Sequence, residues 1–253
     1  MTLDSDSAAG PLQGATVAAE EVAAFDRIAR DWWDPHGDFR PLHQLNPVRI
    51  DWIRYAAAHH FGCDPLAEQP FSGLTMIDIG CCGGLVTEAM ARLGADMLGI
   101  DASEQSVRVA EAHADGQNLP VRYRRAAPEE LAGEKARFDA VLALEVVEHV
   151  ADLDRFIEAG AVLLRPGGAM ILSTINRTLK SLALAKVGAE YVLRWLPAGT
   201  HDWRKFVKPS ELAAVLRRHG LVVTDLGGIV YNPMRDAWAL GRDLDVNYMA
   251  LAV

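Results

Sequence analysis

Short apolar runs recur through the middle of the chain and are separated by stretches with helical periodicity. The apolar runs lie near residues 75–79, 96–100, 121–125, 138–144 and 169–175. The helical stretches lie near 84–93, 103–113, 152–164 and 209–219. This alternation predicts βαβ units and a parallel sheet.

Two further apolar runs follow the last predicted helix. They cover residues 221–230 and 245–253, and a turn-rich stretch separates them. No crossover helix fits between them, so we expect them to pair in antiparallel fashion. The pattern therefore predicts an α/β protein with a mostly parallel sheet.

The first sixty residues carry a different pattern. Residues 1–15 are rich in Asp, Ser, Ala and Gly, which predicts a disordered tail. We expect a helix near 17–30, a loop over 37–44, and a second helix that begins at Asn46 and Pro47 and ends near Phe61. These expectations give one domain over 16–253 with a helical cover at about 16–62.

Composition narrows the class of protein. The chain has 253 residues, is half apolar, and has a net charge of −9, which suits one domain and argues against wholesale nucleic-acid binding. Its three cysteines show no metal-site spacing, so we expect reduced thiols in a cytoplasmic protein. No signal peptide is recognisable, and no apolar run approaches the roughly 18 residues that span a bilayer.

A glycine-rich loop follows the first predicted strand. It contains Asp78, Gly80 and Gly84, with Cys82 and Leu85 at the positions where a dinucleotide loop needs its second and third glycines. That spacing argues against a dehydrogenase. A plain strand-to-helix turn is the alternative interpretation of the loop.

Asp101 ends the next predicted strand. The carboxyl ends of neighbouring parallel strands share one edge of the sheet, where nucleoside cofactors bind, and a carboxylate there can accept hydrogen bonds from both ribose hydroxyls. Asp101 lies about 20 residues beyond the glycine loop, the usual spacing for this role. Capping of the following helix is the alternative.

The end of the fourth predicted strand and the segment after it contain candidate binding and catalytic residues. Leu144 can present its carbonyl and side chain to a cofactor, although core packing explains it equally well. Glu145, Glu148 and His149 could hold Mg²⁺ or Zn²⁺, or His149 could act as a general base. A solvent-facing turn is the alternative for Glu148 and His149.

The motif D-x-G-x-x-x-G resembles the first motif of class I S-adenosylmethionine (SAM) methyltransferases, with Cys82 in place of the middle glycine. Beyond this motif, the chain resembles the UbiG-type O-methyltransferases of ubiquinone biosynthesis. The blocks that carry the resemblance are 32–34, 39–49, 145–150, 173–177, 187–191, 199–203 and 245–249.

The resemblance implies a Rossmann-like three-layer sandwich with a seven-stranded, mostly parallel sheet and one antiparallel strand. It also implies that the protein binds SAM and methylates ring hydroxyls of polyprenylated phenols, catechols or quinols at two steps of the pathway. It points to Arg49 as a cofactor contact besides Gly80, Asp101 and Leu144. A guanidinium suits the SAM carboxylate because it donates two parallel hydrogen bonds. A magnesium requirement, with Glu145, Glu148 and His149 as ligands, stays open.

Residues 176–208 form a locally basic insert in an acidic chain. If 179–196 is helical, Lys180, Lys186 and Arg194 lie on one side beside a wide apolar face, which is typical of an interfacial helix. We therefore expect reversible contact with the inner face of the plasma membrane and with other ubiquinone-pathway proteins, but a lid packed on the core is the alternative.

Two alternative functions also remain open for the protein. It could be a methyltransferase for another small phenol or lipid, or a catalytically silent scaffold that binds SAM.

Overall fold

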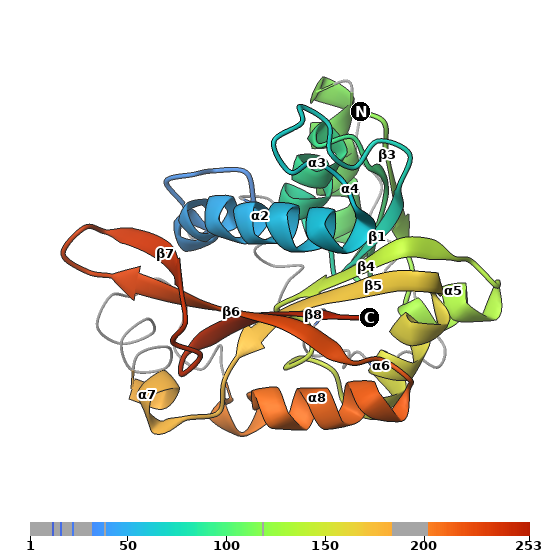
Figure 1. The fold of residues 1–253 in the computed structure, drawn as a ribbon. Helices are drawn as coiled ribbons and strands as arrows, with labels where there is room; N and C mark the ends of the chain where they lie inside the picture. Colours follow the sequence, from blue (N-terminus) through green and yellow to red (C-terminus); the bar gives the residue numbers. More distant parts are fainter. Residues whose placement is uncertain are drawn as a thin grey trace, which may run out of the picture.

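A single mixed sheet organises the chain in a computed structural model that describes residues 12, 16, 22, 32–37, 39–117, 119–183 and 202–253 (Figure 1). Its strands are β1 (Thr75–Ile79), β2 (Asp96–Asp101), β3 (Val121–Arg125), β4 (Phe138–Leu144), β5 (Leu164–Ile175), β6 (Val223–Asn232), β7 (Ala237–Gly241) and β8 (Asn247–Ala252). The longer helices are α2 (Arg40–Phe61), α3 (Leu85–Arg92), α4 (Glu104–Gln117), α6 (Leu153–Val162) and α8 (Pro209–Arg218). Shorter helical segments are α5 (Pro128–Gly133), α7 (Leu179–Ser181) and η3 (Trp203–Lys205).

The strand order is β3-β2-β1-β4-β5-β8-β6-β7. β1 to β5 pair in parallel, whereas β8 runs antiparallel to both β5 and β6, and β7 runs antiparallel to β6. The predicted fold class is confirmed. The described residues form eight strands, one more than predicted, because part of the turn-rich stretch before 245 folds back on β6 as β7.

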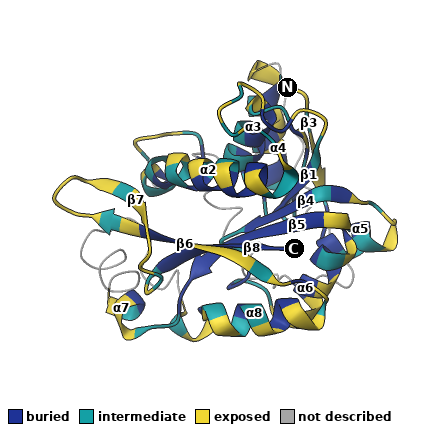
Figure 2. Cartoon of the chain, viewed as in Figure 1, coloured by how far each residue is buried: buried dark blue, intermediate teal, exposed yellow. Residues whose placement is uncertain are grey.

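Successive residues of the central strands face two separate cores. In β4, Ala140 and Leu142 pack with α2 and α3, while Val141 and Ala143 pack with α6 and α8 on the other face. Figure 1 shows these helices above and below the sheet. Strands buried on both faces read as continuous apolar runs, which explains why the sequence revealed them so clearly. Figure 2 shows this burial in β4, β5 and β8 and the exposure of the β6–β7 hairpin.

Helix α2 begins earlier than the sequence suggested. The predicted loop at 37–44 is wrong over its second half, because the helix starts at Arg40 with Pro41 in its first turn. Proline suits that position because the first amides of a helix have no partner within it. Pro47, which was expected to open the helix, lies inside it. The helix ends at Gly62, whose left-handed conformation (φ +69°) is typical of a C-cap.

Several predicted segments lie outside the described residues. These are most of the tail and of the helix expected at 17–30, and residues 184–201 of the basic insert. Among the described residues, no helix combines the length and the apolar character that crossing a bilayer requires.

Candidate active site

The loop after β1 turns through left-handed backbone conformations. Gly80, Cys82 and Gly84 have φ values of +73°, +48° and +91°. Glycine adopts this region freely, whereas a residue with a Cβ is strained there by about 1–2 kcal/mol. Cys82 therefore stands at a position that favours glycine, and the loop keeps the shape of the motif at a local cost.

Gly80 lies between two neighbouring strands at their carboxyl ends. Its amide donates to the carbonyl of Ile100 at 2.8 Å, which joins the loop to β2. A Cβ on Gly80 would lie 2.6 Å from Cγ2 of Val146, just past the end of β4. Only glycine permits this approach, so Gly80 brings bare backbone to the edge where we predicted cofactor binding.

Asp101 lies at the end of β2 and faces the glycine loop. Its Oδ2 accepts a hydrogen bond from the amide of Cys82 at 2.9 Å, and its Oδ1 accepts one from the amide of Ser103 at 2.8 Å. Ser103 is the residue that caps α4, because its Oγ accepts a hydrogen bond from the amide of Ser106 at 2.9 Å, so the capping alternative for Asp101 is wrong. The contact with Cys82 holds the Asp101 carboxylate against the loop, and its role toward a ribose stays a prediction.

Asp78 anchors the loop to α3 from below. The hydroxyl of Thr87 donates to Oδ2 of Asp78 at 2.6 Å, and the aspartate is 3% exposed. Burial raises the pKa of Asp78 to about 7. The negative charge of Asp101 also raises this pKa, whereas the hydrogen bond from Thr87 lowers it. The carboxyl is therefore poised to ionise near neutral pH, and a nearby cation would favour its charged form.

Two tryptophans cover the far side of the loop, a feature to which the sequence analysis gave no role. The indole N–H of Trp33 donates to the carbonyl of Gly83 at 2.9 Å, and a Cβ on Gly83 would lie 2.1 Å from Cδ1 of Trp32. Trp33 also stacks on the ring of His113, with centroids 3.4 Å apart, and His113 bonds to the buried Glu88. These contacts fasten the segment before α2 to the predicted cofactor loop.

An ion pair closes the other end of the site. Oε1 of Glu145 accepts hydrogen bonds from Arg49 Nη2 at 2.6 Å, Ser173 Oγ at 2.8 Å and Asn247 Nδ2 at 3.2 Å. Burial alone would raise the pKa of Glu145, but the Arg49 charge and the hydrogen bonds from Ser173 and Asn247 hold it below its usual value. Glu145 also has φ +55°, a strained conformation of the kind that gathers at functional sites.

Leu144 is the last residue of β4 and is half-buried. It lies opposite Ser173 in the β4–β5 register. Because β2, β1 and β4 are adjacent, the structure brings Asp101, Gly80 and Leu144 to one edge of the sheet, as predicted.

The predicted metal ligands do not meet as one group. Within the part of the chain that the structure describes, no three His, Cys, Asp or Glu side chains are arranged to hold a metal ion. Burial and the charge of Glu145 raise the pKa of Glu148 well above its usual value, and Glu148 accepts a hydrogen bond from Thr174 at 2.8 Å. A protonated carboxyl must lose its proton before it binds a metal. The ligand set Glu145, Glu148 and His149 therefore stays a prediction.

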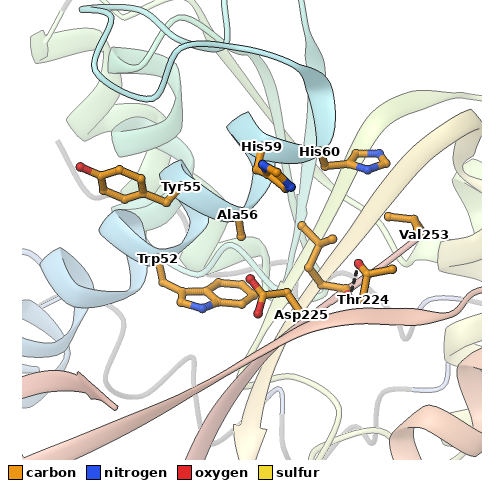
Figure 3. Close-up of a pocket in the computed structure, with 9 residues that line it drawn as sticks. Trp52, Tyr55, Ala56, His59, His60, Thr224, Asp225 and Val253 are labelled. Atoms are coloured by element: carbon orange, nitrogen blue, oxygen red, sulfur yellow. Dashed lines mark hydrogen bonds between the residues drawn. The ribbon is translucent and has the colours of Figure 1, made fainter. Parts of the chain in front are cut away.

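A cavity of about 620 Å³ lies elsewhere in the molecule (Figure 3). It is lined by the last turns of α2, the start of β6 and the end of β8, including Trp52, His59 and Asp225. Ala252 of β8 pairs with Met170, early in β5, so this cavity opens at the opposite edge of the sheet from the glycine loop. It is separate from the site described above.

Sequence reasoning missed several residues of the site. Thr87 donates to the carboxylate of Asp78, and Ser173 and Asn247 donate to that of Glu145, yet none of the three belongs to a recognisable catalytic motif. Ser173 and Asn247 do lie in blocks that carried the family resemblance. Ser173 lies near the end of β5 and Asn247 begins β8, so both lie at the edge of the sheet where the site was expected. That position could have identified them as site residues.

Comparison with known proteins gives a consistent result. A family model described as a methyltransferase domain matches residues 77–172. A ubiquinone biosynthesis O-methyltransferase from Chelativorans sp. (strain BNC1) is 54% identical over 94% of both chains. A protein of the same name from Mesorhizobium japonicum is 53% identical over 94% of this chain and 95% of its own length.

Solved structures share the fold at low sequence identity. A magnesium protoporphyrin IX methyltransferase from Synechocystis PCC 6803 with bound S-adenosylhomocysteine (SAH) superposes with a TM-score of 0.63 at 21% identity, over 91% of this chain and 94% of that one. A SAM-dependent methyltransferase from Clostridium acetobutylicum has a TM-score of 0.59 at 14% identity, over 91% and 97% of the two chains. These likenesses concern the fold alone.

Proposed function

The chain belongs to the family of ubiquinone biosynthesis O-methyltransferases, and from this membership we propose that it transfers the methyl group of SAM to a ring hydroxyl of a polyprenylated phenol or catechol. The proposed reactions are methylation of 2-polyprenyl-6-hydroxyphenol and 3-O-methylation of 3-demethylubiquinol. The observation that carries the proposal is the shared edge of β2, β1 and β4, where Asp101, Gly80 and Leu144 stand side by side.

In this proposal SAM lies across that edge. Asp101 binds the ribose, the backbone at Gly80 lies against the methionine portion, and Leu144 faces the sulfonium region. Arg49 binds the SAM carboxylate, for which it must share or exchange its present contact with Glu145. Asp78, whose pKa burial raises to about 7, becomes ionised when the SAM ammonium lies near it.

Methyl transfer is an in-line displacement from a positively charged sulfur, so the leaving group is already good. The protein contributes by holding the acceptor oxygen close to the methyl carbon and in line with sulfur, which can lower the barrier by roughly 7–11 kcal/mol. The network of Arg49, Glu145, Ser173 and Asn247 stands beyond β4, where the acceptor must approach the methyl group.

We assign His149 the role of general base toward the phenol. It is half-buried in the turn after β4, where its amide donates to the carbonyl of Val146 at 2.9 Å. Its loss in His149→Ala should lower kcat by about 10²–10⁴-fold and leave the dissociation constant of SAH unchanged. An equal loss of SAH binding would indicate a structural role instead.

Magnesium dependence is proposed separately. If Mg²⁺ is required, Glu145, Glu148 and His149 would have to rearrange to hold it, because the described residues contain no metal-binding group, and the bound ion would supply Lewis-acid chemistry. Turnover before and after removal of divalent ions with a chelator decides this, with Mg²⁺ restoring activity in the supporting outcome. Undiminished turnover in the chelator would remove the proposal.

Membrane contact through the basic insert is also a proposal. Lys180 pairs with Asp243 and Asp245, so its charge is partly compensated, whereas Lys186 and Arg194 lie outside the described residues. We expect anionic liposomes to sediment the protein and the triple variant Lys180→Glu, Lys186→Glu, Arg194→Glu to weaken this. Equal sedimentation of that variant would rule out the insert as the contact.

One assay tests the function itself. The purified protein is mixed with SAM and a short-chain 3-demethylubiquinol analogue, and formation of both SAH and the methyl ether is measured. Turnover with this acceptor and little with simple phenols supports the proposal. Turnover only with other acceptors would favour a different phenol or lipid methyltransferase, and SAM binding without turnover would favour a scaffold.

A further inference from the structure

Two buried polar atoms beside Glu145 have no hydrogen-bond partner among the residues that the structure describes. They are Nε of Arg49 and Oδ1 of Asn247. Nη2 of Arg49 and Nδ2 of Asn247 both donate to the same oxygen, Oε1 of Glu145, whereas Nη1 of Arg49 donates to Oδ1 of Asn46 at 3.5 Å. Buried polar groups are paired in the great majority of cases, so an unfilled donor and an unfilled acceptor in one small network require an explanation.

The orientation of the Asn247 amide follows from its partner. An ionised carboxylate only accepts hydrogen bonds, so the NH₂ group of Asn247 must face Glu145 and the carbonyl oxygen is the atom left over. Asn247 is 7% exposed, so bulk water does not serve that oxygen. Oδ1 of Asn247 is therefore a hydrogen-bond acceptor that a donor from a bound ligand could pair.

Position in the sheet places this acceptor at the reactive edge. Asn247 is the first residue of β8 and pairs with Ile175, the last residue of β5, so it lies level with the carboxyl ends of the parallel strands. The predicted cofactor loop follows β1, and β8 is the third strand from β1 in the order β1-β4-β5-β8. At about 4.8 Å per strand, this separation is about 14 Å, too far for direct contact with a ligand atom that lies on the loop itself.

We propose that Oδ1 of Asn247 accepts a hydrogen bond from a ring hydroxyl of the methyl acceptor. The inference rests on the proposed function, which places a hydroxylated ring beyond β4. A carbonyl oxygen accepts from a hydroxyl but gains nothing from a methoxy group, which has no proton to donate. Asn247 therefore distinguishes acceptors that carry the hydroxyl from analogues in which it is removed or methylated.

A matched pair of variants tests this contact. Asn247→Ala and Ser173→Ala each remove one donor to Oε1 of Glu145, but only the first removes the unpaired acceptor. We expect Asn247→Ala to raise the KM for a short-chain demethylubiquinol analogue about tenfold, with the SAH dissociation constant within about twofold of the wild type. Ser173→Ala should raise this KM less than Asn247→Ala does, because it leaves Oδ1 of Asn247 in place. An increase in Ser173→Ala as large as in Asn247→Ala, or a loss of SAH affinity alone in Asn247→Ala, would overturn the inference.

A second measurement changes the ligand as well as the protein. Acceptor analogues lacking one ring hydroxyl at a time are compared as inhibitors of the wild type and of Asn247→Ala, or of Asn247→Ser if the alanine variant does not fold. One deletion should weaken inhibition about tenfold in the wild type and much less in the variant. The same loss in both proteins, or no loss in the wild type, contradicts the contact. Wild-type turnover of the parent acceptor, measured first, shows whether the proposed function itself holds.

Discussion

Arg49 of α2 and Glu145 at the end of β4 form an ion pair of 2.6 Å in which the arginine side chain is only 4% exposed. The pair joins the helical cover to the strand that ends at the reactive edge. Loss of the pair should therefore disturb both the stability of the protein and the site.

Removal of one partner leaves the other charge buried and unpaired. We expect Arg49→Met to lower the free energy of unfolding by about 3–5 kcal/mol, and the double variant Arg49→Met, Glu145→Gln to recover most of the loss. Arg40→Met, which breaks the exposed pair with Asp236, serves as the control and should cost less than about 1 kcal/mol. Urea unfolding measures all three, and a loss in Arg49→Met no larger than in the control would contradict the argument.

The strain at Cys82 can be relieved. Its φ of +48° suits glycine, so Cys82→Gly should raise the free energy of unfolding by about 1 kcal/mol. Cys82→Val should lower it, since a β-branched residue tolerates this conformation least. Thermal unfolding compares the three proteins. A destabilised glycine variant would show that contacts of the thiol outweigh the backbone strain.

Stability should depend on pH through Asp78. Its pKa is about 7 in the folded protein and about 3.9 in an unfolded chain, so the folded state binds the extra proton between these values. The free energy of unfolding must then fall as pH rises through this window, by on the order of 4 kcal/mol from this group. Asp78→Asn keeps an acceptor for Thr87 and removes the titration. Urea unfolding between pH 5 and 8 should show the wild type losing stability relative to the variant, and parallel curves would refute the assignment.

The contact of Trp32 with the glycine loop predicts a steric effect. An alanine Cβ at Gly83 would lie 2.1 Å from Trp32, so Gly83→Ala should displace the indole and cost about 1–3 kcal/mol. Gly133→Ala is the matched control because a Cβ there meets nothing within 4 Å. Intrinsic tryptophan fluorescence and SAH affinity should change in the first variant only. An unchanged spectrum in Gly83→Ala would show that the tryptophan does not rest on the loop in solution.

The sequence predicted the fold wherever burial is strong. β1 and β4 were located residue for residue because strands covered on both faces are largely apolar. The start of α2 was missed because two prolines, Pro41 and Pro47, both fit a first turn, and the pattern alone favoured the wrong one. β7 was missed because the strand is only five residues long and its residues are mostly exposed, so it lacks the pattern of a buried strand.

The candidate site divides in the same way. Gly80, Asp101 and Leu144 lie at the carboxyl ends of strands whose order the fold class implies, so their meeting at one edge could be predicted. The contacts of Glu145 with Arg49 and Asn247 join segments far apart in the chain through side chains. Local sequence patterns do not predict such contacts, which only the folded structure shows.

β8 is synthesised after both of its neighbours, β5 and β6, and all six of its residues are buried between them. On the ribosome, these two strands cannot reach their final spacing until residues 247–252 have emerged. A nascent chain that stops short of this segment would expose two unpaired strand edges and would be a target for chaperones and proteases. The same late segment delivers Asn247, so completion of the sheet and completion of the site are one event.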